Sequence, residues 1–167
     1  MISRKIRSCD IIIATTMLII LSPLMLIISF LLIIIDGKPV IYKQLRVGYK
    51  GRKFFIFKFR TMKQVIYKNE NLRLTYLGKI LRKTSLDELP QLINVINKDM
   101  SIVGPRPLPE EIEEKINNSI KAKRRKILPG ITGMSQINYT GKNRTLSEKI
   151  SLDIEFIDNY TLYNYFL

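Results

Sequence analysis

The sequence contains no histidine and a single cysteine, Cys9. Without histidine, the chain has no Ser–His or Cys–His nucleophile pair and no imidazole for acid–base chemistry or metal binding. A single cysteine excludes an intrachain disulfide and every CxxC redox or zinc motif. Any chemistry must therefore use carboxylates, lysine and arginine, hydroxyl groups, or metal ions held by oxygen atoms.

Acidic residues are scarce in the first half of the chain. Residues 1–83 contain 17 Lys/Arg and 3 Asp/Glu, whereas residues 84–167 contain 11 of each. The net charge of +14 therefore lies entirely in the first half, beside the most apolar stretch. Such a distribution predicts an anionic partner, which can be lipid headgroups, nucleic acid or a phosphorylated substrate. The length of 167 residues favours one domain rather than two.

Charge is absent altogether from the 25 residues of segment 11–35. A straight helix of that length extends about 37 Å, more than the roughly 30 Å hydrocarbon core of a bilayer. Ser22-Pro23 lies at the midpoint, and proline removes one helical N–H, so we expect a kink or break there. Ser22 Oγ or a neighbouring helix should then donate to the carbonyl freed near residue 19.

Basic residues flank this apolar segment on both sides: Arg4, Lys5 and Arg7 before it, and Lys38, Lys43 and Arg46 after it. Because basic flanks stay in the cytoplasm, we favour a re-entrant helix that turns at Ser22-Pro23 over a helix that spans the bilayer. Residues 1–37 are then a membrane-inserted helix. Residues 38–167 are a cytoplasmic domain that lies on the membrane.

The remaining sequence predicts an α+β fold. Segments 40–42 and 54–62 read as strands that can form a short β-hairpin across a glycine-containing loop. Amphipathic helices are predicted at 72–83, from Ser85 to Ile96, and over 110–128. The expected architecture is an N-terminal re-entrant membrane helix followed by a small cytoplasmic domain of amphipathic helices with that hairpin.

Ser85-Leu86-Asp87-Glu88 is the first segment that could carry chemistry. It reads either as a capping box or as two adjacent carboxylates at a helix N-terminus, where phosphate also binds. With Ser85 as the N-cap, Pro90 falls inside the helix; with Asp87 as the N-cap, Pro90 falls in the first turn, where it is tolerated. In a chain without histidine, a carboxylate is the favoured nucleophile, and its neighbour can hold Mg²⁺.

Two further segments suggest anion binding. Pro105-Arg106-Pro107 holds an arginine on a stiff backbone, which suits phosphate recognition, although a rigid connector with a solvated arginine has the same sequence. Segment 129–133 is a glycine-containing loop that reads as an anion site or as a simple turn. Lys58 and Arg60 share one strand face. This face is either exposed to solvent, or it directs the two cations at a phosphate group.

The order and the amino-acid sequences of these segments resemble those of the bacterial sugar transferase family, the monotopic polyprenyl-phosphate phosphoglycosyl transferases. The resemblance covers nearly the whole chain, and the block 81–108 is its most specific part. The matching stretches are Arg4 to Asp10 leading into the apolar segment with Ser22-Pro23, KFRTM at 58–62, LRKTSLDELPQLINVI at 81–96, DMSIVGPRPL at 99–108 and LPGITGMSQIN at 128–138.

The resemblance implies transfer of a sugar-1-phosphate from a UDP-sugar to undecaprenyl phosphate, with release of UMP, at the cytoplasmic face of the bacterial inner membrane. This reaction starts surface polysaccharide synthesis. It implies that Asp87 attacks the sugar-bearing phosphate and that Glu88 binds Mg²⁺. The other implied substrate-binding residues are Arg106 with its neighbours Pro105 and Pro107, and Arg82, Lys58 and Arg60. The family's re-entrant helix breaks at the position of Ser22-Pro23, and the anionic leaflet is a further partner.

Some features depart from the family pattern. Met134 stands where tryptophan is common, and the Gly-Arg-Asn that usually follows is Gly141-Lys142-Asn143 here, displaced along the chain. The chain ends at Leu167, where typical members continue into an amphipathic segment, so a short or truncated member is expected. The alternatives are a non-catalytic or truncated membrane adaptor of the same fold, and a glycosyltransferase that releases UDP. A nucleic-acid binder is disfavoured because no recognisable module is present.

Overall fold

The computed structural model describes residues 4–63, 73–137, 145–161 and 165. The first half contains α1 (Arg4–Asp36), β1 (Ile41–Val47), the 3-10 helix η1 (Tyr49–Gly51), β2 (Lys53–Phe59), α3 (Tyr76–Lys83), the 3-10 helix η2 (Leu86–Glu88) and α4 (Gln91–Ile96). The second half contains β3 (Ser101–Val103), α5 (Glu110–Glu113), α6 (Asn118–Arg124), β4 (Gly130–Thr132), α7 (Met134–Ile137) and α8 (Leu146–Asp158). The α+β class and the long apolar N-terminal helix are confirmed.

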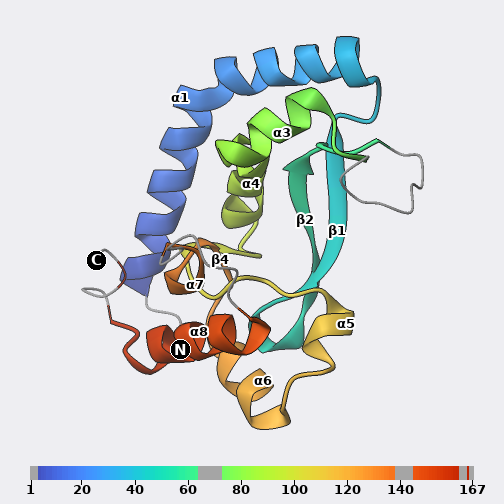
Figure 1. Ribbon diagram of the computed structural model, residues 1–167. Helices are drawn as coiled ribbons and strands as arrows, with labels where there is room; N and C mark the ends of the chain where they lie inside the picture. Colours follow the sequence, from blue (N-terminus) through green and yellow to red (C-terminus); the bar gives the residue numbers. More distant parts are fainter. Residues whose placement is uncertain (1–3, 64–72, 138–144, 162–164, 166–167) are drawn as a thin grey trace.

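Helix α1 continues through Pro23 but bends near its middle into two arms (Figure 1). Proline has no N–H to offer the carbonyl of Ile19, four residues earlier, which accounts for the bend. Ser22 Oγ donates to that carbonyl at 2.8 Å, as the sequence predicted. Among the described helices, α1 is the one long and apolar enough to cross a membrane.

Both arms of α1 pack on the same body. In the first arm, every fourth residue is buried, Ile6, Asp10 and Ala14, and this face meets α4 and β3. In the second arm, Ile28 and Leu32 are buried in a cluster that also contains Phe59 and Leu81. The opposite sides of both arms expose large apolar side chains: Ile12, Ile19, Ile20, Leu26, Ile27, Phe30 and Ile34. The helix therefore presents an apolar outer surface while its two ends stay with one domain.

Strands β1 and β2 form the expected antiparallel hairpin, with Ile41 opposite Phe59. The alternation along β2 holds only in its first part, where Phe54 and Ile56 join the core while Phe55 is exposed. Phe59, which shares a face with Phe55, is buried in the cluster with Ile28, Leu32 and Leu81, because the second arm of α1 covers this end of the strand. Asn94, fully buried on α4, binds the backbone of β2. Its Nδ2 donates to Phe55 O at 2.7 Å, and its Oδ1 accepts from Phe57 N at 3.1 Å. This side chain thus fixes α4 against the strand that carries Lys58.

The helix predicted from Ser85 is shorter than expected, and neither proposed N-cap is right. Leu86–Glu88 form η2, while α4 begins only at Gln91, with Pro90 at its N-cap position. Ser85 has φ +57° and makes no side-chain capping bond, so the capping-box interpretation is wrong. Proline is tolerated at a helix start and excluded from its interior, so Pro90 sets the start of α4.

The single helix predicted over 110–128 is also wrong. It divides into α5 and α6 because Asn117 Oδ1 accepts a hydrogen bond from Ser119 N at 2.9 Å, which starts a new helix. The helix predicted over 72–83 is present only in part, because α3 begins at Tyr76, where its N-cap Thr75 accepts from Gly78 N, and Leu74 forms a β-bridge with Met62. Leu72, where that prediction began, lies outside the described residues.

Gly78 lies where α3 crosses the chain that leaves β2. A Cβ atom at this position would be 2.1 Å from the backbone oxygen of Thr61, and no side-chain rotation relieves such a contact. We therefore expect Gly78→Ala to lower the free energy of unfolding by about 1–3 kcal/mol. Thermal unfolding in detergent measures this, with Lys79→Ala on the exposed side of α3 as control. Equal midpoints for both variants would contradict the close contact.

Candidate active site

Asp87 and Glu88 lie side by side in η2, between α3 and α4. The left-handed backbone of Ser85 ends α3 and starts this short turn. Asp87 is 8% exposed, and this burial raises the pKa of its carboxyl above the ordinary value, against the opposing charge of Lys58. The result is a poorly solvated carboxylate, which is the state that makes a carboxylate reactive as a nucleophile.

Two cations from other parts of the chain meet at Glu88. Lys58 Nζ, from β2, lies 2.5 Å from Glu88 Oε1, and Arg106 Nη2 lies 3.6 Å from the same oxygen. The structure therefore brings Asp87, Glu88, Lys58 and Arg106 together from three separate segments. Lys58 faces the carboxylates rather than open solvent.

Arg82 and Arg60 lie in different surroundings. Arg82 Nε donates to Thr61 Oγ1 at 2.9 Å, and its charge acts on Asp87, so it borders the site. Arg60 is buried, and its guanidinium donates to the carbonyls of Asp36, Gly37 and Lys38. These are the last carbonyls of α1 and the turn after it, which a cation stabilises. The structure does not bring Arg60 to the carboxylate pair.

The loop Pro105–Pro107 is anchored at each of its backbone carbonyls. Pro105 O accepts from Gly130 N at 3.0 Å, Arg106 O from Arg124 Nη2 at 2.6 Å, and Pro107 O from Arg46 Nη1 at 3.1 Å. The Arg106 side chain is 43% exposed and lines the cleft described below. The expected stiff backbone is present, with its arginine directed at Glu88.

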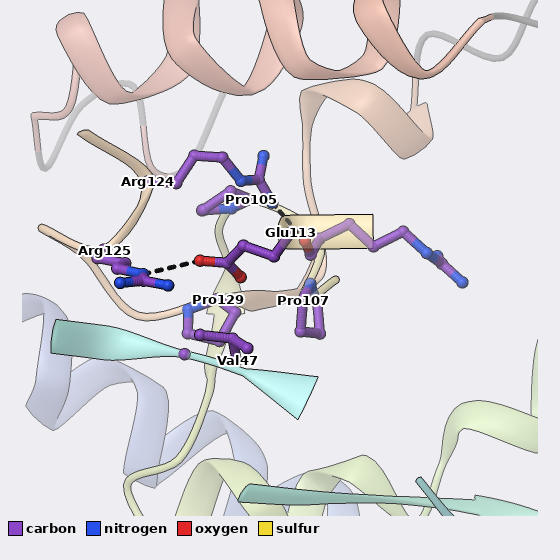
Figure 2. Close-up of a pocket in the computed structure, with 9 residues that line it drawn as sticks. Val47, Pro105, Pro107, Glu113, Arg124, Arg125 and Pro129 are labelled. Atoms are coloured by element: carbon purple, nitrogen blue, oxygen red, sulfur yellow. Dashed lines mark hydrogen bonds and ion pairs between the residues drawn. The ribbon is translucent and has the colours of Figure 1, made fainter. Parts of the chain in front are cut away.

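The rear of this loop rests on charged residues whose role was not predicted from the sequence (Figure 2). Arg124 forms a buried ion pair with Asp153 of α8, and Arg125 Nε donates to Glu113 Oε1 at 2.7 Å. An aspartate three residues after Ile150, on the buried side of α8, is the signal that could have indicated such a partner. Its basic partner is not visible in the sequence because 29 residues separate the two.

The Arg124–Asp153 pair is almost fully enclosed, with side-chain exposures of 7% and 4%. Removal of one partner leaves a buried charge without its counterion, which costs about 3–5 kcal/mol. We expect Asp153→Leu to lower the unfolding midpoint strongly and Arg124→Met/Asp153→Leu to recover most of the loss.

The matched control for this pair is the exposed pair Lys123–Asp158. Asp158→Leu should change the stability by less than about 1 kcal/mol, since exposed pairs contribute little. Similar midpoints for Asp153→Leu and Asp158→Leu would show that the buried pair does not hold the loop.

A cleft of about 380 Å³ opens beside the carboxylate pair. Its lining includes Glu88 and Arg106, Ser135 and Gln136 of α7, and Leu146, Lys149, Ile150 and Asp153 of α8. Pockets of this size, with a few polar groups on partly apolar walls, hold small-molecule ligands. The lining residues from α7 and α8 were not predicted from the sequence.

The acidic side chains of the site suit a magnesium ion. Across the described ranges, no group of three or more Asp, Glu, Cys or His side chains is placed to enclose a metal. Mg²⁺ commonly binds through one or two carboxylates and takes its other ligands from water and substrate phosphates. Glu88, which lines the cleft, fits that requirement.

The family model described as bacterial sugar transferase matches residues 3–166. The chain belongs to the bacterial sugar transferase family. It is 42% identical, over 76% of its length, to the "Uncharacterized sugar transferase EpsL" of Bacillus subtilis (strain 168). It is 37% identical, over 94% of its length, to the "UDP-glucose:undecaprenyl-phosphate glucose-1-phosphate transferase" of Escherichia coli (strain K12).

The chain spans 64% of the Bacillus protein and 37% of the Escherichia coli protein. It spans 78% of the "Exopolysaccharide production protein ExoY" of Rhizobium meliloti (strain 1021), at 35% identity. Met134, where the resemblance led us to expect tryptophan, opens α7 directly before Ser135 and Gln136 of the cleft. The other departure, residues 141–143, lies outside the described residues.

Proposed function

We propose that this sugar transferase moves a sugar-1-phosphate from a UDP-sugar to undecaprenyl phosphate and releases UMP. The product is the lipid-linked diphosphate sugar that starts surface polysaccharide synthesis. The observation that carries this proposal is the buried Asp87 next to Glu88, which lines the cleft and is held by Lys58 and Arg106. The name of the Escherichia coli relative supports this donor and acceptor, and that of the "Undecaprenyl-phosphate galactose phosphotransferase" of Salmonella typhimurium supports the acceptor.

In the proposed reaction, an oxygen of Asp87 attacks the phosphorus that carries the sugar. The new bond joins this oxygen to phosphorus, and the bond from phosphorus to the UMP phosphate breaks, so UMP leaves with the electron pair. An oxygen of undecaprenyl phosphate then attacks the same phosphorus and returns Asp87 as a carboxylate. The burial of Asp87 leaves the carboxylate with little water to displace before it reacts.

The cations of the site offset the negative charge that attack on a phosphate brings together. Arg106, on its anchored loop, offers a guanidinium to the donor's phosphates at little entropic cost. Lys58 and Arg82 counter the charge of Asp87. Glu88 would hold Mg²⁺, which when bound neutralises part of the charge on the donor's diphosphate.

We further propose that residues 1–37 form a re-entrant membrane helix and that residues 38–167 lie on the cytoplasmic face of the inner membrane. Both arms of α1 pack on one domain and expose apolar surface outward, which suits a helix that enters and leaves on one side. The basic first half favours an anionic leaflet, by about 1 kcal/mol per basic residue near the surface.

This topology predicts that both ends of α1 lie on the same side of the membrane. In a Cys9→Ser background, single cysteines placed by Lys5→Cys and by Lys38→Cys should both react with an impermeant thiol reagent in inside-out vesicles. Neither should react in right-side-out vesicles. Labelling of the two positions from opposite sides would establish a spanning helix instead.

The enzymatic proposal is tested with purified protein in nanodiscs that contain undecaprenyl phosphate, supplied with Mg²⁺ and a panel of UDP-sugars. The proposal expects UMP release that depends on one donor and on Mg²⁺, together with a sugar-labelled lipid. Release of UDP would identify a glycosyltransferase. A folded, membrane-bound protein that releases neither nucleotide from any donor would favour the adaptor.

A further inference from the structure

The α8 side of the cleft contains a cation that the proposed chemistry does not use. Lys149 lines the cleft and is partly buried. Within the part of the chain that the structure describes, it forms no ion pair, whereas Lys58 pairs with Glu88 and Lys123 with Asp158. A partly buried ammonium without a counterion gains stability when an anion binds beside it.

The surroundings of Lys149 define what kind of anion fits. Arg106 lines the same cleft of about 380 Å³, as do the carboxylates of Glu88 and Asp153. Glu88 is already paired with Lys58 and Arg106, and Asp153 with Arg124, so neither carboxylate neutralises Lys149. Leu108, Leu146 and Ile150 supply apolar wall to the same cleft. A nucleoside monophosphate satisfies both features, because its phosphate meets the cations and the flat face of its base covers the apolar side chains.

Two substrates of the proposed reaction carry phosphate, and the position of α8 favours the soluble one. Helix α8 packs mainly on α6 and α7, and it lies at the end of the molecule away from the second arm of α1 (Figure 1). The acceptor's phosphate is attached to a lipid and reaches the site from the membrane side. The water-soluble nucleotide donor reaches the α8 wall without that restriction.

We infer that Lys149 binds the uridine monophosphate portion of the donor, with its ammonium on the phosphate that departs and the apolar wall against the nucleoside. This inference deepens the proposed function and rests on it. It makes α8 a donor-recognition element and separates two tasks within one cleft. Arg106 and Glu88 act beside the reacting phosphate, and Lys149 holds the part of the donor that leaves as UMP.

The test compares Lys149→Met with Lys115→Met, which removes the same charge from an exposed position outside the cleft. For Lys149→Met we expect the donor KM and the inhibition constant of UMP each to rise about tenfold, equivalent to about 1.4 kcal/mol of binding. We expect kcat and the KM for undecaprenyl phosphate to change less than about threefold. The substitution weakens binding of the donor by the same amount in the ground state and in the transition state, so the barrier between the two is unchanged. Lys149→Arg should retain most of the donor affinity, and Lys115→Met should match the wild type.

Each other outcome overturns the inference. An unchanged donor KM in Lys149→Met, with an active wild type, would remove Lys149 from the donor site and leave the proposed function intact. A rise in the lipid KM alone would assign the cation to the acceptor's phosphate. A wild type that turns over no donor would instead overturn the proposed function. Thermal unfolding of all three variants shows whether a kinetic change comes from misfolding.

Discussion

Asp87→Asn should abolish sugar-phosphate transfer and leave the protein folded. The substitution keeps the size of the side chain but replaces the attacking carboxylate with an amide that does not attack phosphorus. Because loss of a covalent nucleophile removes the main reaction path, we expect the rate to fall by at least about 10⁴-fold. Nucleotide release measured over several hours quantifies the residual activity.

The same substitution should not lower stability. Burial raises the pKa of Asp87, which means that the folded protein disfavours the charged carboxylate relative to the unfolded chain. At neutral pH the charged carboxylate therefore lowers the free energy of unfolding, and a neutral amide at the same position removes this destabilisation. We expect an unfolding midpoint equal to or above that of the wild type. A clear drop in the midpoint, with activity reduced in proportion, would mean that Asp87 serves the fold rather than the reaction.

Arg106→Ala is expected to have the second largest effect, a fall of about 10²–10³-fold in kcat/KM for the donor. The Arg106 side chain lies half in solvent and 3.6 Å from Glu88, so its removal leaves no buried charge alone. The backbone hydrogen bonds that anchor the loop do not involve this side chain and survive the change. The effect should therefore appear in the kinetics and not in the unfolding midpoint.

Arg106→Lys distinguishes the charge from the shape of the guanidinium. Lysine keeps the positive charge but loses the planar fork that binds two phosphate oxygens at once. We expect an activity between those of the wild type and Arg106→Ala. If Arg106→Ala retained wild-type kcat/KM, the loop would be a rigid connector with a solvated arginine, the simpler interpretation of its sequence.

Features that depend on neighbouring residues were predictable from the sequence. The missing N–H of Pro23 affects one carbonyl four residues away, and Ser22 lies in reach of it. The period-two pattern over 54–59 identified the hairpin strand. The paired carboxylates and the proline-flanked Arg106 were visible because each is a contiguous segment, and the structure places them together at Glu88.

Features that depend on distant partners were not predictable in the same way. Arg60 shares a strand face with Lys58, so the sequence pattern predicted phosphate binding for both cations. The turn after α1 lies beside Arg60, however, and its carbonyls accept hydrogen bonds from the Arg60 guanidinium. Asn94 reads as a polar interruption in an apolar helix, yet it binds the open edge of β2. The single helix over 110–128 failed because the local hydrogen bond of Asn117 outweighs a continuous apolar stripe.

The covalent role of Asp87 is tested most directly by the intact mass of the protein after incubation with its UDP-sugar and Mg²⁺, without undecaprenyl phosphate. The account predicts that the wild type gains the mass of one sugar-phosphate, located on the peptide that contains Asp87, and that UMP is released in equal amount. Asp87→Asn should gain nothing, and addition of undecaprenyl phosphate should remove the adduct from the wild type. Product formation with no adduct on the wild type, or an adduct that persists in Asp87→Asn, would contradict it.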